Sequence, residues 1–399
     1  MSIEIFDPCV LAGIKLKNRI IRSATHEGMS DENGQPTQRL KELYVRLAKG
    51  EVGAIITGYA GVGRNGKSSL YRMQMADEDT CISHYKSLVD GVHQYNTPII
   101  LQIAHCGRQT RSKVTGFKPV APSALRDRLF DEEIPQELCD DAIEGVIDSF
   151  VNAVMRAKSA GFDAVQLHMA HGYLLSEFLS PAMNHRVDKW GGDTENRYRI
   201  IAEIFKRVQA KAGNFPILVK INAYDNRNNG MRIEEAIKIS KLLEKSGCAA
   251  IEVSCGVAED GFNTCRSEKN PMPAIMKYNY KFEKVPAPLK PLVGFIADKS
   301  MPVTKPLKLY NVQAAAAIKK QVSVAVIAVG GIGSLADIRD ILDGGKADFV
   351  SMSRPFIIEP DIVKKFKEKT RGVSLCQYCN YCMMGIEAGP LRCFYGKLK

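Results

Sequence analysis

The chain has 399 residues, of which 45% are hydrophobic and 25% charged, and this globular composition supports a large core. Its net charge of +11 comes from lysines and arginines dispersed among acidic residues, which argues against a nucleic-acid surface and leaves a general attraction for acidic or phosphorylated ligands. No run approaches the roughly 18 apolar residues of a membrane span, and the N-terminus lacks a basic region followed by a long apolar run, so we expect a cytoplasmic protein with no membrane partner.

Short apolar runs rich in β-branched residues alternate with segments of helical period along the chain. The predicted strands are residues 19–23, 54–58, 99–103, 164–168, 217–221, 250–254, 324–329 and 347–351. The predicted helices are residues 38–50, 82–95, 140–159, 195–211, 233–246, 312–320 and 334–343. Strands that alternate with helices predict an α/β fold with a parallel sheet, and eight of them predict a closed (β/α)8 TIM barrel.

The alternation breaks between residues 261 and 309, which are rich in proline, lysine and aromatic residues. This stretch is too long for an ordinary connection and is predicted to be an insertion after strand six. Because barrel active sites lie at the C-terminal strand ends, it is expected to form part of the substrate wall or a lid. A subunit contact or a surface ornament is the alternative. We therefore expect a barrel over residues 1–370 and a separate cysteine-rich segment over residues 371–399.

The motif HMAHGY follows the predicted fourth strand and places His168, His171 and Tyr173 at one strand end. Two imidazoles and a phenol can donate hydrogen bonds to one oxygen or pass a proton beside it, which is typical of a reaction centre. The alternative is that the histidines are ordinary core residues and Tyr173 packs as an aromatic. Three buried polar groups in one place favour the reaction centre, because burying them costs free energy unless they serve each other or a ligand.

A glycine-rich turn, GGIG, follows the predicted seventh strand and precedes a helix that opens at Ser334. Gly330 and Gly331 let the backbone approach an anion, and the helix N-terminus presents N–H donors to it. Ser353 and Arg354 end the next strand and add a hydroxyl and a guanidinium. Loops after strands seven and eight are where such barrels bind phosphate, so the two segments together predict a phosphate site. The alternative is a turn with only a structural role.

Eleven cysteines without a secretory signal indicate reduced thiols, a metal or a cluster rather than a disulfide framework. Cys376, Cys379, Cys382 and Cys393 are separated by two, two and ten residues near the C-terminus. Three closely spaced thiolates can bind one face of a 4Fe-4S cluster while a fourth returns from the following turn. Structural zinc and free thiols remain open as alternatives.

The segment AGFDAVQLHMAHGYLLSEFLSPAMNHRVDKWGGDTENRYR, residues 160–199, resembles the signature of the Old Yellow Enzyme family of FMN-dependent ene-reductases. Within that family, the closer likeness is to the branch of 2,4-dienoyl-CoA reductase and trimethylamine dehydrogenase. The resemblance runs from LKNRIIRSA near the N-terminus to the C-terminal cysteines and is interrupted by residues 261–309.

The resemblance implies a role for each matching position. His168 and His171 would bind the carbonyl oxygen of the substrate above the flavin, and Tyr173 would give a proton to the α-carbon. Lys220 would face the N1 and O2 edge of the flavin as a point charge. The implied FMN positions as a whole are Ser23, Ala24, Thr25, Gly58, Tyr59, Gln102, Lys220, Gly330, Gly331, Ser353 and Arg354. NADH or NADPH would reduce the flavin in the same site.

The chain also departs from the family pattern. After strand one the family often has Pro-Met followed by Cys or Thr, whereas this chain has the run Ser23, Ala24, Thr25 and His26. His26 is therefore expected to contact substrate or to alter the redox potential. Tyr59 and Gly61 stand where smaller or different residues are frequent, so the shape of the substrate pocket does not transfer from the family.

The cysteine segment resembles the 4Fe-4S segment of the same branch, including Asn380 between the second and third cysteines. In that branch the cluster receives electrons from a further flavin domain. This chain ends at Lys399, so we expect a ferredoxin or flavoprotein partner to reduce the cluster; the alternative is a cluster that is structural or vestigial. The family also forms dimers and higher assemblies, which implies a homo-oligomer.

Three functions follow from these observations. The leading one is reduction of an activated C=C bond of an α,β-unsaturated carbonyl compound, with hydride from flavin N5 and the proton from Tyr173. The second is amine oxidation or demethylation by the same cofactor, for which Tyr278, Tyr280 and Phe282 offer an aromatic cage. The third is a flavin or iron-sulfur electron-transfer subunit, against which the intact His-His-Tyr set argues.

Overall fold

The computed structural model describes residues 4–68, 70–127 and 133–398, with eight short parallel strands at the centre. Each strand pairs with the next in chain order, and the last pairs with the first, which closes the sheet. This confirms the predicted (β/α)8 barrel, with strand ends within two residues of those predicted. The barrel strands are β3 (Ile20–Arg22), β4 (Ala54–Ile56), β7 (Ile99–Ala104), β10 (Ala164–Met169), β11 (Ile217–Asn222), β12 (Ala250–Ser254), β13 (Ala325–Val329) and β14 (Phe349–Met352).

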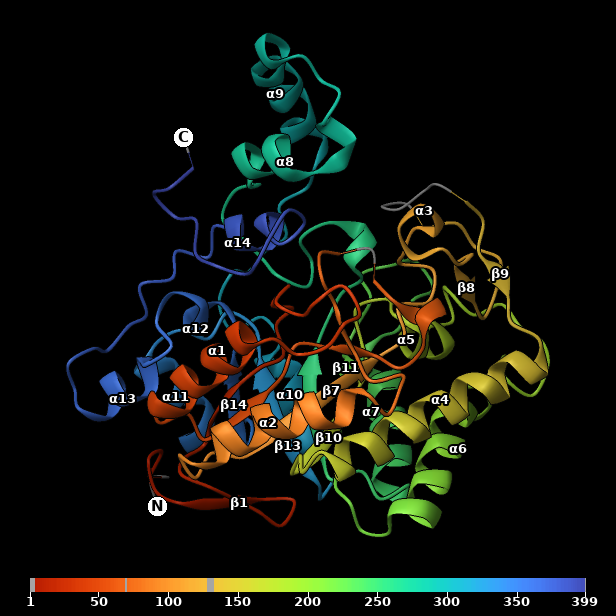
Figure 1. Ribbon diagram of the computed structural model, residues 1–399, viewed down its shortest axis with the longest axis vertical. Coiled ribbons are helices and arrows are strands. Elements are labelled where there is room, and N and C mark those ends of the chain that lie inside the picture. Colours follow the sequence, from red (N-terminus) through yellow and green to blue (C-terminus); the bar gives the residue numbers. More distant parts are fainter. Residues whose placement is uncertain (1–3, 69, 128–132, 399) are drawn as a thin grey trace.

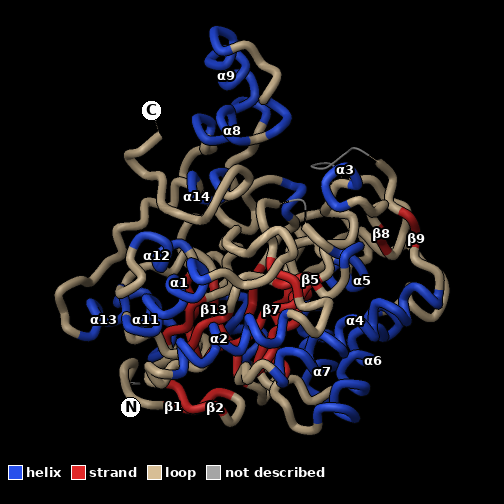
Figure 2. The backbone as a smooth tube through the Cα atoms, in the orientation of Figure 1, coloured by secondary structure: helices blue, strands red, loops and turns tan. Residues whose placement is uncertain are grey.

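Helices surround the strands on the outside of the barrel (Figures 1 and 2). Those predicted from the sequence are all present within two residues, because each carries an apolar stripe that packs on the sheet. In α4, for example, Ile143, Ile147, Phe150 and Val154 are fully buried at helical spacing. The seven are α1 (Gln38–Lys49), α2 (Cys81–His93), α4 (Asp140–Ser159), α6 (Thr194–Ala212), α7 (Ile233–Lys245), α10 (Val312–Lys319) and α11 (Leu335–Asp343).

The two ends of the barrel differ in polarity. An apolar cluster that includes Ile21, Ile100 and Leu218 fills the N-terminal end. An antiparallel hairpin, β1 (Cys9–Leu11) and β2 (Ile14–Leu16), adds Leu11 and Leu16 to this cluster and was not predicted from the sequence. Apolar side chains therefore close the N-terminal end of the barrel interior. The polar strand residues lie toward the C-terminal strand ends, where the active site of a TIM barrel is found.

Short elements in the loops complete the described structure. Next to the strand ends lie α5 (Leu174–Leu179), α12 (Arg354–Ile358) and α14 (Tyr381–Gly385). The remaining strands and α-helices of the loops are β5 (Ala60–Gly61), β6 (Gln74–Met75), β8 (Val120–Ala121), β9 (Gln136–Glu137), α3 (Ser112–Thr115) and α13 (Ile362–Lys367), and single-turn 3-10 helices lie at Arg64–Gly66, Ala258–Asp260, Tyr280–Phe282 and Ala287–Leu289. None of the helices in the described parts of the chain is long and apolar enough to cross a membrane.

The predicted insertion folds into helices and is not an irregular loop. It contains α8 (Met272–Tyr278) and α9 (Lys290–Ser300), and both helices carry a proline in the first turn, where its missing N–H costs nothing. In Figure 1 these helices project beyond the strand ends, and α14 lies between them and the barrel. We call residues 271–308 the arm.

Candidate functional site

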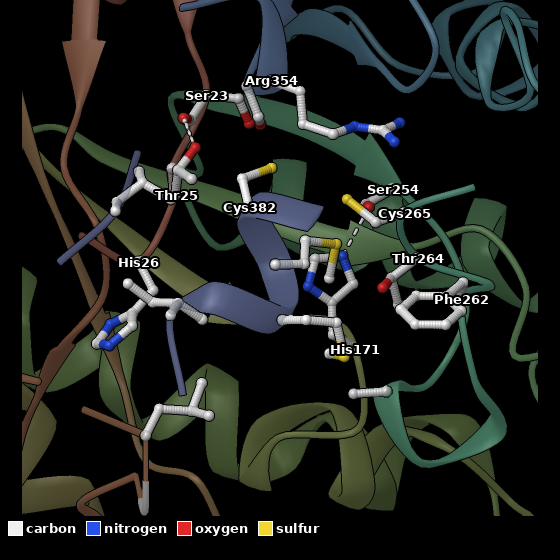
Figure 3. Close-up of a pocket in the computed structure, with 18 of the residues that line it drawn as sticks. Ser23, Thr25, His26, His171, Ser254, Phe262, Thr264, Cys265, Arg354 and Cys382 are labelled. Atoms are coloured by element: carbon white, nitrogen blue, oxygen red, sulfur yellow. Dashed lines mark hydrogen bonds between the residues drawn. The ribbon is translucent and has the colours of Figure 1, made fainter. Parts of the chain in front are cut away.

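A cavity of about 540 Å³ lies at the C-terminal ends of the barrel strands. Figure 3 shows side chains that line it, with His26, His171 and Arg354 coming from three different loops. It brings together nearly all positions that the sequence singled out: Ser23, Ala24, Thr25, His26, Tyr59, Gln102, His168, His171, Tyr173, Lys220, Gly330, Gly331, Ser353 and Arg354. Among the predicted FMN positions, Gly58 is the one that does not line the cavity, and of the four predicted metal ligands Cys382 alone lines it.

The end of β10 brings the His-His-Tyr set into contact. The His168 ring lies 5.0 Å from that of His171 and 4.8 Å from that of Tyr173, both in edge-to-face geometry. A left-handed turn makes this approach possible, because His171 has φ 66° and Gly172 has φ 83°. A Cβ on Gly172 would lie 2.2 Å from Nε2 of Gln109, so the turn requires glycine there. The spacing HxxHGY therefore gathers three side chains at one point.

Both histidines are neutral, and a backbone hydrogen bond indicates which nitrogen of His168 carries the ring proton. Burial lowers the pKa of His168 well below its usual value, and the neighbouring His171 and Lys220 act in the same direction. The Ala170 N–H donates to Nδ1 of His168 (3.3 Å), which assigns the ring proton to Nε2. Burial, with Lys220, lowers the pKa of His171 to about 3, and its Nε2 lies 2.7 Å from the Ser254 hydroxyl. His168 thus offers an N–H donor at the cavity wall.

Tyr173 is a protonated phenol beside a second tyrosine. Burial raises the pKa of Tyr173 well above 10, and nearby Tyr59 and Cys106 add to this effect. The Tyr59 ring centroid is 5.4 Å from that of Tyr173 and 5.2 Å from the stacked ring of His26. Tyr59 donates to the Ser68 hydroxyl at 3.4 Å. Tyr59, which departs from the family pattern, therefore packs directly against Tyr173, the predicted proton donor.

A hydrogen-bonded group that we call the barrel floor lies under the cavity and consists of Ser23, Gln166, Lys220, Glu252 and Ser351. The Lys220 ammonium lies 3.1 Å from the Glu252 carboxylate and donates to the Ser23 hydroxyl at 2.9 Å. Glu252 also accepts from Ser23 and Ser351 (2.6 Å each) and from Gln166 (2.9 Å). Burial opposes its charge, but Lys220 and the three donors outweigh burial and hold the pKa of Glu252 below its usual value.

Sequence reasoning missed Glu252, although a signal was present. In β12 the apolar side chains of Ile251 and Val253 join the core outside the barrel. Alternation then directs Glu252 into the interior, together with Ala250 and Ser254. An acidic residue inside a barrel needs a cation, and Lys220 on the adjacent strand β11 pairs with it in register.

The predicted phosphate end is built from the loops after β13 and β14. Gly330 and Gly331 have φ 118° and 71°, and a Cβ on either would collide with Tyr310 or with the Leu307 carbonyl. Arg354 is buried and donates through Nη1 to the Arg266 carbonyl (2.7 Å) and to Oδ1 of Asn380 (2.6 Å). A guanidinium has five N–H donors, so Nε and Nη2 retain donors for an anion. Arg354 therefore also ties the barrel to the cysteine segment.

Glu27 is a second buried carboxylate, and it binds the backbone of Gly58, the predicted FMN position that does not line the cavity. Glu27 is 2.7 Å from the Arg22 guanidinium and accepts from the Tyr44 hydroxyl at 2.7 Å. It also accepts from the Gly58 N–H at 3.0 Å, so Gly58 serves this cluster. The neighbouring His26 lies 2.8 Å from the Tyr71 carbonyl, and burial lowers its pKa, so the neutral ring donates through Nε2. Glu27 thus fixes the loop that presents His26.

The arm and the C-terminal segment form the outer wall of the cavity. Tyr278, Tyr280 and Phe282 of the arm all line it. The Arg111 guanidinium lies 4.1 Å from the centroid of the Tyr280 ring. Burial raises the pKa of Glu387 to about 7, although Arg111 acts in the opposite direction. The outer part of the cavity is therefore aromatic, with two cations, Arg111 and Lys281, and one weak acid, Glu387.

The four C-terminal cysteines are free and partly buried. Burial raises the pKa of Cys376 to about 11, with Cys379 and Cys393 close enough to add to the effect. Cys382 lines the cavity and is influenced by Cys265 as well. In the described ranges, no three His, Cys, Asp or Glu side chains are arranged to hold a metal ion. The thiols are thus close to one another, but in the described residues three of them do not come together as ligands.

The amino-acid sequence matches the NADH:flavin oxidoreductase / NADH oxidase family over residues 4–285 and 296–372. The chain belongs to this family, whose members are flavin-dependent oxidoreductases. This confirms the resemblance found in residues 160–199. Residues 286–295, within the arm, fall outside the matched regions.

Individual proteins that resemble this chain in sequence or in fold are also oxidoreductases by name. The chain is 33% identical over 386 residues to an NADH oxidase of Thermoanaerobacter brockii, covering 96% of this chain and 54% of that protein. It is 31% identical over 363 residues to an NADPH dehydrogenase of Geobacillus sp., covering 90% and 92%. The fold resembles an old yellow enzyme homologue from Zymomonas mobilis, with a TM-score of 0.74, 24% identity and coverage of 97% and 99%. This chain spans about half the length of the T. brockii relative.

The residues of the cavity fit FMN. An anionic phosphate suits the glycine turn after β13 together with Ser353 and Arg354. The Lys220 ammonium, which also lines the cavity, is a second buried cation and suits an electron-rich ring edge. Gln102, whose Nε2 donates to Oε1 of Gln166 at 2.7 Å, adds an amide next to the barrel floor. The lining therefore includes two buried cations, Lys220 and Arg354, which suits an anionic cofactor.

Proposed function

We propose that this chain is an FMN-dependent oxidoreductase that reduces the activated C=C bond of an α,β-unsaturated carbonyl compound. The observation that carries the proposal is the contact of two neutral histidines and one protonated tyrosine at the cavity wall, above a buried lysine. A neutral imidazole N–H and a phenol O–H suit an oxygen that gains negative charge and a carbon that needs a proton.

The roles of the chain's own residues follow from their positions. When bound, FMN supplies the hydride acceptor and donor. Nε2–H of His168 donates to the substrate carbonyl oxygen, and His171, fixed by Ser254, stands beside it. These donors stabilise the charge that develops on the oxygen more than they stabilise the ground state. The Tyr173 hydroxyl then transfers its proton to the α-carbon. Lys220 supplies a positive charge to the flavin edge, in a position fixed by Glu252.

We propose NADH or NADPH as the hydride donor, bound in the same cavity. The family membership supports this, and so do the NADH oxidase and NADPH dehydrogenase relatives. Arg111 and Lys281 at the outer wall give the cavity mouth positive charge that suits the phosphates of such a donor.

Amine oxidation is the second candidate, because one observation favours it. Tyr278, Tyr280 and Phe282 line the outer cavity together with Glu387, and an aromatic wall with a carboxylate attracts a cation. Arg111 opposes this, since it lies over the Tyr280 ring where an ammonium would otherwise bind.

One anaerobic titration tests both candidates. The purified full chain should be yellow and release FMN on denaturation. NADH or NADPH should bleach the flavin, and an enone should restore its colour, whereas an amine should leave the oxidised flavin unchanged. A colourless protein that cannot be reconstituted with FMN would defeat the proposal, and bleaching by an amine would select the second candidate.

We also propose that residues 371–399 form a segment distinct from the barrel of residues 1–370.

The 4Fe-4S cluster is a separate proposal, supported by the spacing of Cys376, Cys379, Cys382 and Cys393. Anaerobic purification followed by iron and acid-labile sulfide analysis tests the cluster. About four iron atoms per chain are expected. Zinc in place of iron, or no metal at all, would contradict it.

A further inference from the structure

The outermost helix of the arm exposes its large apolar side chains. Leu292, Phe295 and Ile296 of α9 are 59%, 59% and 60% exposed, and Leu289, just before the helix, is 50% exposed. Positions 289, 292, 295 and 296 are three or four residues apart, so they share one face of a helical turn. These side chains make a contiguous apolar surface, which we call the arm face.

The packing of α9 accounts for this exposure. Gly294 is its one buried residue, and a Cβ there would lie 3.3 Å from Cγ of Met276 in α8. The helix therefore packs on α8 through its smallest residue and turns its largest ones outward. Monomeric proteins rarely leave contiguous apolar surface of this kind in water unless it binds something. Residues 286–295 also fall outside the regions matched by the family, so this face is an addition to the common barrel.

The arm as a whole is positively charged. Residues 277–308 contain seven lysines and two acidic residues, a net charge of +5. Lys299 lies beside the apolar side chains, with its ammonium 4.4 Å from the centroid of the Phe295 ring. Long lysine stems can cover apolar surface while their ammonium groups reach an anion.

We propose that the arm face docks on an anionic lipid surface. Apolar side chains at a projecting tip (Figure 1), on an arm rich in lysine, are the combination that binds at a bilayer interface. There the apolar face enters the acyl boundary, and the lysines meet lipid phosphates. An arm of net charge +5 would repel a second copy of itself. At 11 residues, α9 is about 16 Å long, which is too short to span a bilayer and long enough to lie in its interface.

The chain's single tryptophan makes the test specific. Trp190 is buried in the barrel, so its emission does not report on the arm. In the F295W variant, vesicles that contain about 30% phosphatidylserine should shift the added emission to the blue, and vesicles of phosphatidylcholine alone should not. About 0.5 M salt should weaken binding, because the lysine contribution is screened.

Sedimentation with the same vesicles then tests which residues bind. L292S/I296S should reduce the bound fraction of the full chain at least about tenfold, because the lipid contact loses two apolar side chains that it would bury. V187S is the matched control, since Val187 is 99% exposed on the barrel and should bind vesicles as the wild type does. Circular dichroism and thermal unfolding show whether each variant is folded.

Three results would overturn the proposal. The wild type would not bind anionic vesicles, or L292S/I296S would bind them as well as V187S does. Alternatively, L292S/I296S would change the elution volume on gel filtration, which assigns the arm face to a second copy or another protein.

Discussion

The barrel floor and the His-His-Tyr wall face the same cavity but differ in how their polar groups are used. On the floor, the Glu252 carboxylate accepts from Ser23, Ser351 and Gln166 and pairs with Lys220. On the wall, burial keeps His168 and His171 neutral and Tyr173 protonated. A charged, fully bonded group fixes geometry, whereas a neutral donor at a cavity surface can act on a ligand. We therefore expect floor substitutions to change stability and wall substitutions to change rate.

Tyr173→Phe should have the largest effect on rate. It removes the proton donor and keeps the ring, so alkene reduction should slow by about 10²- to 10⁴-fold. Flavin reduction by NAD(P)H should stay within about twofold, because that step needs no proton from Tyr173. Rapid-mixing measurements of the two half-reactions separate these effects. Tyr198→Phe, outside the cavity, is the matched control. Equal slowing of both half-reactions would contradict the proton-donor role.

Glu252→Gln tests the floor. The substitution keeps the shape of the side chain but leaves the buried Lys220 ammonium without its counter-charge, which costs about 3–5 kcal/mol of unfolding free energy. Ser351→Ala removes one hydrogen bond to the same carboxylate and should cost only about 1 kcal/mol. Denaturant unfolding of the apoprotein measures both variants without involving catalysis. A loss below about 1 kcal/mol in Glu252→Gln would show that the ion pair does not hold the floor together.

The barrel could be predicted because its signal is local. Runs such as residues 54–56 and 99–103 bury both faces, so their apolar composition shows directly in the sequence. The β1–β2 hairpin was missed because three-residue strands are too short to show alternation. The arm helices were missed because prolines usually end helices, whereas Pro273 and Pro291 lie in first turns, where they are tolerated.

Within the site, the sequence predicts residues that follow strands better than it predicts their partners. The resemblance pointed to His168, Lys220 and Arg354, and all three line the cavity. It could not show that Arg354 donates to Asn380, which lies 26 residues later, or that Gly58 serves Glu27. Such contacts join segments through the tertiary fold, and no pattern within one segment records them.

His168→Ala tests the proposed hydrogen bond from the wall to the carbonyl oxygen of the substrate. Loss of one preorganised donor should reduce the rate of alkene reduction by about 10²- to 10³-fold. The same substitution combined with His171→Ala should weaken the binding of a phenol, seen as the loss of its charge-transfer band with the flavin. The apoprotein should unfold within about 1 kcal/mol of the wild type, because a wall group is not part of the floor. A large loss of stability with little loss of rate would show that His168 of the wall has the structural role that we assign to the floor.

The smallest expected effect is that of pH. Burial sets the pKa of His171 at about 3 and that of His168 well below 6.5, so both stay neutral from pH 5 to 8. Tyr173 stays protonated over the same range, because burial raises its pKa above 10. Single-turnover alkene reduction should therefore vary by less than about twofold between pH 5 and 8. Unfolding should respond differently: the histidines are protonated in the unfolded chain below about pH 6.5, so stability should fall as the pH drops through that value. A rate that changes at pH 6.5 in step with stability would show that a histidine of the wall titrates in the folded protein.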